Sequence, residues 1–218
     1  MNDRRIGAVL FDMDETLIDH VRTAVEVCHD SFEAFKDRLE GVDETAFMKT
    51  FWQKANDLWE MMFDGVISGD VARPYMFINT LRALKADTSI AHDMLEDFEL
   101  RLVAATRLAE GAAEVLRTLR AAGIRLGVVT NGYTRMQSRK IDHHNLREMT
   151  DFVLVSEAVG FHKPHRGIFE EALARAGVEA GATIFVGDNL KADIAGAVGA
   201  GMHAVLIDPK GERTRPET

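Results

Sequence analysis

Five short runs of apolar, mostly β-branched residues constrain the fold of this chain more than any other feature. They cover residues 6–11, 124–130, 152–155, 183–187 and 204–207. Because the runs are continuous rather than alternating, both faces of the sheet that they predict must be covered. Helical patterns separate the later runs, and strands alternating with helices are typical of a doubly wound α/β domain with a parallel, Rossmann-like sheet.

Two of the helical patterns have recognisable ends. One covers residues 114–122 and stops at Gly123, and the other covers 165–176, between Pro164 and Gly177. Proline in the first turn and glycine after the last turn are positions that helices favour. These signals support the alternation of strands and helices in the second half of the chain.

More than a hundred residues separate the first two runs, far more than a simple crossover needs. From about His20 to Arg107 the apolar residues step by three and four, as in helices. The first such stripe begins Val21, Val25, Cys28 and Phe32. We expect these stripes, and also Trp59, to form the core of a helical bundle. The predicted domains are an α/β core of residues 1–19 and 108–218 and an inserted helical cap of residues 20–107.

Composition excludes several classes of protein. Of the 218 residues 46% are hydrophobic, which is enough for a packed core and argues against disorder. The formal net charge of −9 repels nucleic-acid phosphates, so we expect no nucleic-acid partner. Cys28 is the only cysteine, and neither a signal-peptide segment nor a membrane-spanning apolar run is present. These features favour a cytoplasmic protein without a membrane partner.

Polar residues follow the predicted strands at the points where they end. Asp12 and Asp14 come directly after the first run, and Asp188 follows the fourth, with Asp193 five residues further on. Ligands of open α/β sheets bind beyond the carboxyl ends of the strands, so these acidic side chains should meet at one edge. Clustered carboxylates repel one another unless a cation neutralises them. Mg²⁺, which takes a few carboxylates together with water and phosphate oxygens, is the expected cofactor.

The same edge should also attract an anion. Thr130 closes the second run, Asn131 and Gly132 follow it, and Lys163 precedes the helix after the third run. A hydroxyl, the backbone N–H groups of Asn131 and Gly132, and an ammonium can bind phosphate oxygens. Each residue alone has an ordinary explanation, such as a helix cap or a solvated lysine. Their order and spacing together predict a site for a phosphoryl group and a metal ion.

These residues resemble the motifs of the haloacid dehalogenase superfamily. The four motifs are D-x-D-x-T at 12–16, Thr130 at a strand end, Lys163 before Pro164, and G-D-x-x-x-x-D at 187–193. The inserted helices resemble the first cap type of that superfamily. Within it, the chain is similar to the branch of nucleoside monophosphatases and N-acylneuraminate 9-phosphatase. One departure is Glu15, where the family often has glycine.

The resemblance implies a role for each residue. Asp12 would be the nucleophile that forms an aspartyl-phosphate, and Asp14 the general acid and base. Mg²⁺ would be held by Asp12, the backbone carbonyl of Asp14, and Asp188, with Asp193 supporting the ligands from behind. Thr130, Asn131 and Lys163 would bind the transferring phosphoryl group. The implied reaction is Mg²⁺-dependent hydrolysis of a small phosphorylated metabolite, a nucleoside monophosphate or phosphosugar, by a monomer or homodimer. Cap residues that face the catalytic edge should select the substrate, and the first candidates are His20, Asn56 and Trp59, with substrate contact as the alternative to core packing for Trp59.

Other functions on the same fold stay open. A 2-haloacid dehalogenase needs neither metal nor an acid, and typically has an aromatic residue where Asp14 stands. A phosphomutase would keep every motif and differ only in the group that receives the phosphoryl. A phosphonatase would need a Schiff-base lysine in the cap, for which Lys36, Lys49 and Lys54 are the available residues. A non-catalytic binding protein would be expected to lack Asp12 or Asp14, and both are present.

Overall fold

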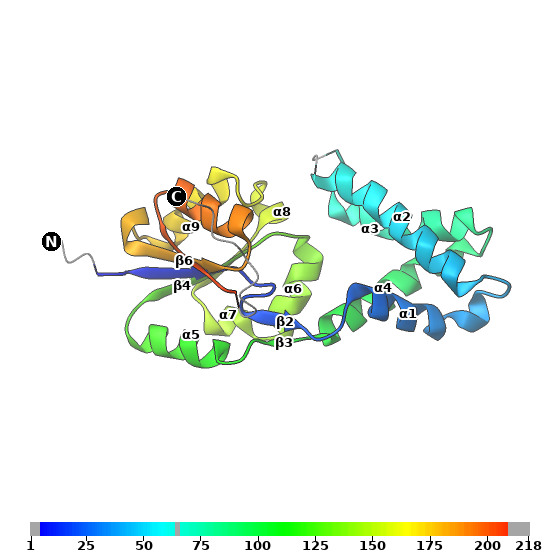
Figure 1. The fold of residues 1–218 in the computed structure, drawn as a ribbon, viewed down its shortest axis with the longest axis horizontal. Coiled ribbons are helices and arrows are strands. Elements are labelled where there is room, and N and C mark those ends of the chain that lie inside the picture. Colours follow the sequence, from blue (N-terminus) through cyan, green and yellow to red (C-terminus); the bar gives the residue numbers. More distant parts are fainter. Residues whose placement is uncertain (1–4, 64–65, 209–218) are drawn as a thin grey trace. The chain divides into compact units, whose positions relative to one another are not determined.

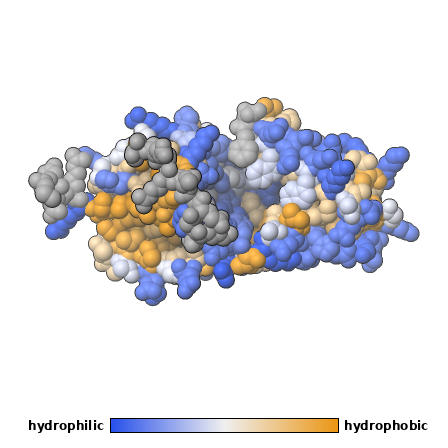
Figure 2. Space-filling model, in the orientation of Figure 1, coloured by the Kyte–Doolittle hydropathy of each residue, from blue (hydrophilic) through white to orange (hydrophobic). Residues whose placement is uncertain are grey.

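The computed structural model describes residues 5–63 and 66–208, and the chain divides into two compact units. An α/β unit combines Met1–His20 with Arg107–Thr218, and a helical unit covers Val21–Thr106. The described part of the chain contains no helix that is long and apolar enough to cross a membrane. Figure 2 shows hydrophilic side chains over much of the drawn face, with an apolar area on the α/β unit.

A parallel five-stranded sheet forms the centre of the α/β unit (Figure 1). Its order is β5-β4-β1-β6-β7, and the strands cover Phe152–Val155, Arg125–Thr130, Ala8–Phe11, Thr183–Gly187 and His203–Leu206, respectively. The register places Ala8 beside both Arg125 and Thr183, so the central strand starts level with its two neighbours. The predicted doubly wound α/β core is therefore confirmed, with strand limits shifted by at most two residues.

Both faces of this sheet are covered, as the continuous apolar runs predict. On one face, β1 and β4 pack against α5 (Ala112–Ala121), α6 (Thr134–His143) and α7 (Leu146–Met149). On the other face, residues of β1, β4, β5 and β6 pack against α9 (Arg166–Ala176) and α10 (Gly196–Gly199). Alternate residues of β1 point to opposite faces, Val9 and Phe11 to the first and Leu10 to the second.

Short elements complete the α/β unit. They are α8 (Ser156–Val159), η3 (Ala180–Ala182), η4 (Leu190–Ala195), and a two-stranded sheet of β2 (Ile18–His20) and β3 (Thr106–Leu108). The helix predicted at 165–176 begins at Arg166, with His165 as its N-cap. Pro164 therefore precedes the cap instead of occupying the first turn. Gly177 ends α9 in the left-handed conformation, as predicted (φ 66°).

The helical unit contains α1 (Ala24–Ala34), η1 (Lys36–Arg38), α2 (Glu44–Phe63), α3 (Gly69–Ala83), η2 (Thr88–Ile90) and α4 (Ala91–Ala104). Its core is built on contacting aromatic rings of α1, α2, α3 and α4, with centroids 4.8 to 6.2 Å apart: Phe32, Phe47, Phe51, Phe77 and Phe98. Each such pair adds about 0.5–1.5 kcal/mol to the burial of its rings. Aromatic packing therefore stabilises the bundle independently of the sheet.

Three predicted core residues of the helical unit are exposed. Val21 is 50% exposed and precedes α1, which begins at Ala24 after a Thr23 capping box with Glu26. Val25 lies in α1 but is 53% exposed. The buried face of α1 lies instead on Val27, Cys28, Ser31 and Phe32. Trp59 is 42% exposed, so the expectation that it belongs to the bundle core is wrong.

Candidate active site

Parallel register brings the first and fourth motifs together. β1 and β6 are neighbours, with Phe11 level with Val186, so Asp12 and Asp188 leave the sheet at the same edge. The Asp12 N–H donates to the Val186 carbonyl at 2.8 Å and fixes the start of the loop. Thr130 ends β4 on the other side of β1. The edge thus receives residues from three adjacent strands.

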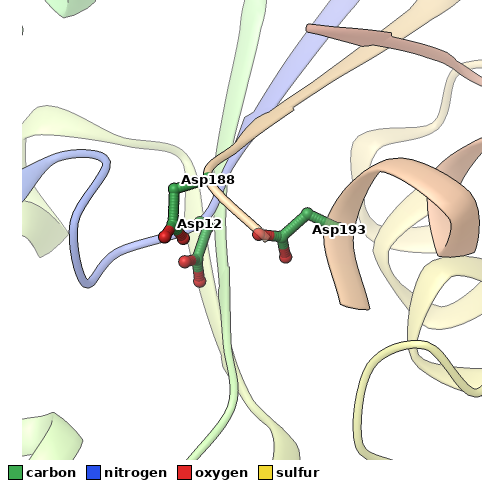
Figure 3. A group of neighbouring side chains, drawn as sticks. All are labelled: Asp12, Asp188 and Asp193. Carbon is green, nitrogen blue, oxygen red and sulfur yellow. The ribbon is translucent and has the colours of Figure 1, made fainter. Parts of the chain in front are cut away.

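Three carboxylates meet at this edge (Figure 3). One oxygen from each of Asp12, Asp188 and Asp193 lies within 4.8 Å of the other two. Asp12 and Asp188 extend from the strand ends, whereas Asp193 points toward them from η4. The Asn189 N–H donates to Asp193 Oδ2 at 2.9 Å and orients it. Hard oxygen donors at this spacing suit a divalent cation.

Gly187 permits the close approach of Asp193. A Cβ atom at this position would lie 2.5 Å from the Asp193 carboxyl carbon, well inside contact distance. Any larger residue would therefore push Asp193 or the strand end away. The glycine of the fourth motif is required by packing at this point.

Lys163 is the cation buried among these acids. Its Nζ atom donates to Asp12 Oδ1 at 2.6 Å and to Asp193 Oδ1 at 2.7 Å, and its side chain is 2% exposed. Burial lowers the pKa of Lys163, but Asp12 and Asp193 raise it by more, so the ammonium stays charged. Lys163 thus contacts two of the three clustered acids, Asp12 and Asp193.

The pKa of Asp12 is raised to about 7. Burial is the main cause, Asp193 adds repulsion, and the charge of Lys163 works in the opposite direction. A nucleophilic carboxylate must be ionised to attack. A bound divalent cation would favour the ionised form and lower this pKa.

The Asn131 side chain holds the backbone of Lys163. Its Nδ2 donates to the Lys163 carbonyl at 2.9 Å, and its Oδ1 accepts from the Lys163 N–H at 2.8 Å. This paired contact joins the second and third motifs. Asn131 was predicted to bind substrate, but its side-chain amide is hydrogen-bonded to the Lys163 backbone.

Gly132 differs from its predicted role. Its N–H, expected to face an anion, donates to the Ser156 hydroxyl at 3.0 Å. Gly132 has a φ of 142°, and a Cβ atom added to it would lie 3.0 Å from the Gln137 side chain. The backbone conformation and the close contact both explain why glycine occupies this position. The sequence pattern could not distinguish a phosphate-binding amide from a turn amide.

Asp14 lies beside this cluster and is held by two residues that sequence reasoning missed. Lys140 Nζ donates to Asp14 Oδ1 at 2.7 Å, and Gln137 Nε2 donates to Oδ2 at 2.8 Å. Burial raises the pKa of Asp14, but Lys140, Gln137 and His20 together bring it below its ordinary value. The three-residue spacing of Gln137 and Lys140 places them on one face of α6, the only sequence signal that pointed to them.

Glu15 occupies a left-handed backbone position, with φ 57°. Glycine adopts this conformation at no steric cost, which is a physical reason for the glycine often found there in the family that the motifs resemble. The Glu15 carboxylate lies 2.9 Å from His20 Nδ1. Glu15 therefore adopts a backbone conformation that glycine adopts more readily.

Comparison with known proteins places these motifs in context. A family model described as haloacid dehalogenase-like hydrolase matches residues 6–201. A glyceraldehyde 3-phosphate phosphatase of Pyrococcus furiosus is 31% identical over 210 residues, covering 93% of this chain and 80% of that protein. One of Methanothermobacter thermautotrophicus is 42% identical over 90 residues, covering 41% of this chain and 40% of that protein.

Solved structures share the fold. A 2-haloacid dehalogenase from Pseudomonas syringae pv. Tomato DC3000 has a TM-score of 0.75 and 27% identity, covering 97% of this chain and 90% of that one.

The first curated relatives match over less than half of their own length, from 40% to 48%. Both a phosphatase and a dehalogenase are thus among the similar proteins.

Proposed function

The chain belongs to the haloacid dehalogenase-like hydrolases, and from this membership and its site we propose that it is a phosphomonoester hydrolase with Asp12 as nucleophile. The observation that carries the proposal is the second carboxylate, Asp14, held beside the acidic cluster by Lys140 and Gln137. Removing a phosphate ester's alkoxide requires a proton donor, whereas expelling a halide does not. Asp14 has a use in the first reaction and none in the second.

The residues present fit a magnesium ion. Three carboxylates each offer one oxygen within 4.8 Å of the other two, and hard oxygen donors at this spacing are the ligands that a divalent cation takes. We propose that Asp12, Asp188 and the backbone carbonyl of Asp14 would hold it. Asp193 contacts Lys163 and the Asn189 N–H, and it would help to position the metal ligands without binding the ion itself. When bound, the ion would neutralise charge on the phosphoryl oxygens.

In the first step, an Asp12 carboxylate oxygen attacks phosphorus and the bond to the ester oxygen breaks. Asp14 gives its proton to that oxygen, so the alcohol leaves neutral and Asp12 carries the phosphoryl group. In the second step, water attacks phosphorus and Asp14 takes its proton. The bond to Asp12 breaks, which restores the carboxylate and releases inorganic phosphate.

Thr130 and Lys163 are the proposed anion-binding groups. The Lys163 ammonium lies 2.6 Å from the nucleophile and can contact an oxygen of the group that Asp12 attacks. The Thr130 hydroxyl accepts from Gln137 Nε2 at 2.7 Å and donates to the Asn131 carbonyl at 3.3 Å, a long hydrogen bond that it would exchange for one to a phosphoryl oxygen. Asn131 contributes by holding the Lys163 backbone in place.

The proposed substrate is a small phosphorylated metabolite. The two archaeal relatives described above are named for glyceraldehyde 3-phosphate, which makes sugar phosphates the first class to test. Nucleoside monophosphates are the second class, because the motifs resemble that branch of the family. A phosphomutase would share the first step and transfer the group to a sugar instead of water.

Phosphate release from a panel of sugar phosphates and nucleoside monophosphates tests the proposal. Purified protein should release phosphate with Mg²⁺, lose activity in excess chelator, and recover when Mg²⁺ is returned. Ca²⁺ should inhibit, because it favours a looser site of higher coordination number. Halide release from 2-chloropropionate in chelator, without phosphate release from any ester, would establish the dehalogenase instead. A phosphorylated isomer in place of free phosphate would establish the mutase.

A further inference from the structure

The α6 helix presents a buried lysine to a residue far from it in sequence. Lys140 is 7% exposed, and Gln137, one helical turn earlier, is 3% exposed. A buried lysine without a counter-ion is costly, so its position is normally explained by the group that it contacts. Here that group is Asp14, whose side chain is 28% exposed. Lys140 is therefore buried, whereas the carboxylate of Asp14 is partly exposed to solvent.

Both oxygens of Asp14 are engaged from the same helix face. Lys140 contacts Oδ1 at 2.7 Å and Gln137 contacts Oδ2 at 2.8 Å. Two donors on separate oxygens fix the rotation of the carboxylate plane, which one donor alone would not do. Each oxygen has a second lone pair that can carry the proton which Asp14 transfers.

The same helix face reaches the phosphoryl-binding side of the site. Gln137 Nε2 also lies 2.7 Å from Thr130 Oγ1 and 3.1 Å from the Asn131 carbonyl. Lys140 Nζ has no such contact with the second motif among the hydrogen bonds of the described residues; its other neighbour is His20 Nε2 at 3.4 Å. A substitution of Lys140 should therefore affect Asp14 without disturbing Thr130 or Asn131, whereas a substitution of Gln137 would affect all three.

We propose that Lys140 is a positioning residue that orients Asp14 for proton transfer to the leaving group. This inference rests on the proposed phosphatase function. It does not require Lys140 to touch the substrate. Its contribution should appear only in reactions that need a proton from Asp14, because nucleophilic attack by Asp12 does not involve that carboxylate.

Leaving-group dependence separates positioning from a structural role. The value of kcat/KM reports steps up to release of the alcohol, so hydrolysis of the phosphorylated enzyme does not contribute to it. p-Nitrophenolate leaves without protonation, whereas an alkoxide does not. For Lys140→Met, kcat/KM should fall about 10–100-fold with glycerol phosphate, a loss typical of displaced acid catalysis. With p-nitrophenyl phosphate it should fall less than about threefold if only positioning is lost.

Arg135→Met is the matched control, because it removes an exposed cation from the same helix. It should leave the ratio of the two kcat/KM values at that of the wild type. An equal loss on both substrates for Lys140→Met would overturn the inference and assign Lys140 a structural role. If Lys140→Met does not fold, Lys140→Gln keeps a polar side chain at this position, but its shorter stem withdraws the donor from Asp14, and an unchanged ratio in that variant would overturn the inference equally. Wild-type protein that hydrolyses neither ester would instead contradict the proposed function itself.

Discussion

The Lys163 ammonium lies between Asp12 and Asp193, 2.6 Å from one carboxylate and 2.7 Å from the other. This bridge joins the end of β1 to η4 through a residue 151 positions from Asp12 in sequence. The oxygens that Asp12 and Asp193 offer lie within 4.8 Å of one from Asp188, and this spacing of hard donors is the basis of the proposed magnesium site.

Asp12→Asn should abolish phosphatase activity while preserving the fold. The amide keeps the shape of the side chain but lacks the charge and lone-pair reactivity needed to attack phosphorus. We expect a loss of about a thousandfold or more, the scale observed when a covalent nucleophile is removed. Phosphate release measures activity, and circular dichroism checks the fold. More than a tenth of the wild-type rate in a folded variant would contradict the covalent route.

The pH dependence of stability should also report on Asp12. Its pKa rises from an ordinary 3.8 to about 7 in the folded protein, chiefly through burial. Between these values the folded state retains a proton that the unfolded state has released, so this carboxyl lowers stability as pH rises. In chelator, the free energy of unfolding of Asp12→Asn relative to wild type should increase from about pH 4 to about pH 7 and then level off. Urea unfolding at several pH values measures it, and a difference independent of pH would refute the assignment.

Gly187→Ala should destabilise the α/β unit, because its Cβ would lie 2.5 Å from the Asp193 carboxyl carbon. Overpacking of this kind costs about 1–3 kcal/mol. Gly199→Ala is the control, since no neighbouring atom lies within 4 Å of its added Cβ. Alanine there should be neutral or stabilise α10 by up to about 1 kcal/mol. Urea midpoints compare the two, and equal midpoints would show that Asp193 can move at no cost.

Trp59→Ala tests the expectation that residues of the helical cap select the substrate. Its ring is 42% exposed, so Trp59→Ala should change the melting temperature little. We expect it to alter kcat/KM unequally among sugar phosphates and nucleoside monophosphates. Phe51→Ala is the contrast, because that ring is 1% exposed and lies in the aromatic core. It should lower stability by about 3–5 kcal/mol and affect all substrates alike. A uniform effect from Trp59→Ala would place the selective residues elsewhere.

Local signals were sufficient for the sheet and for the residues at its edge. β1, β4 and β6 are continuous apolar runs, and parallel strands place their carboxyl ends together. The convergence of Asp12, Thr130 and Asp188 could therefore be predicted before any contact was known. The family resemblance was carried by the same residues, because each motif occupies a strand end or the loop before a helix.

The tertiary structure alone decided which partners these residues have. Lys140 and Gln137 contact Asp14 across more than 120 positions of sequence, a pairing set by how α6 packs on the sheet. The sequence also did not reveal that the Gly132 N–H donates to Ser156, because a turn glycine does not specify its hydrogen-bond partner. It did not reveal that Trp59 is exposed, because an apolar helical pattern does not specify which of its residues are buried. Periodicity and spacing follow from local backbone geometry, so the sequence determines them directly. Contacts between distant elements depend on packing and burial of the whole unit, and only the folded chain brings those side chains together.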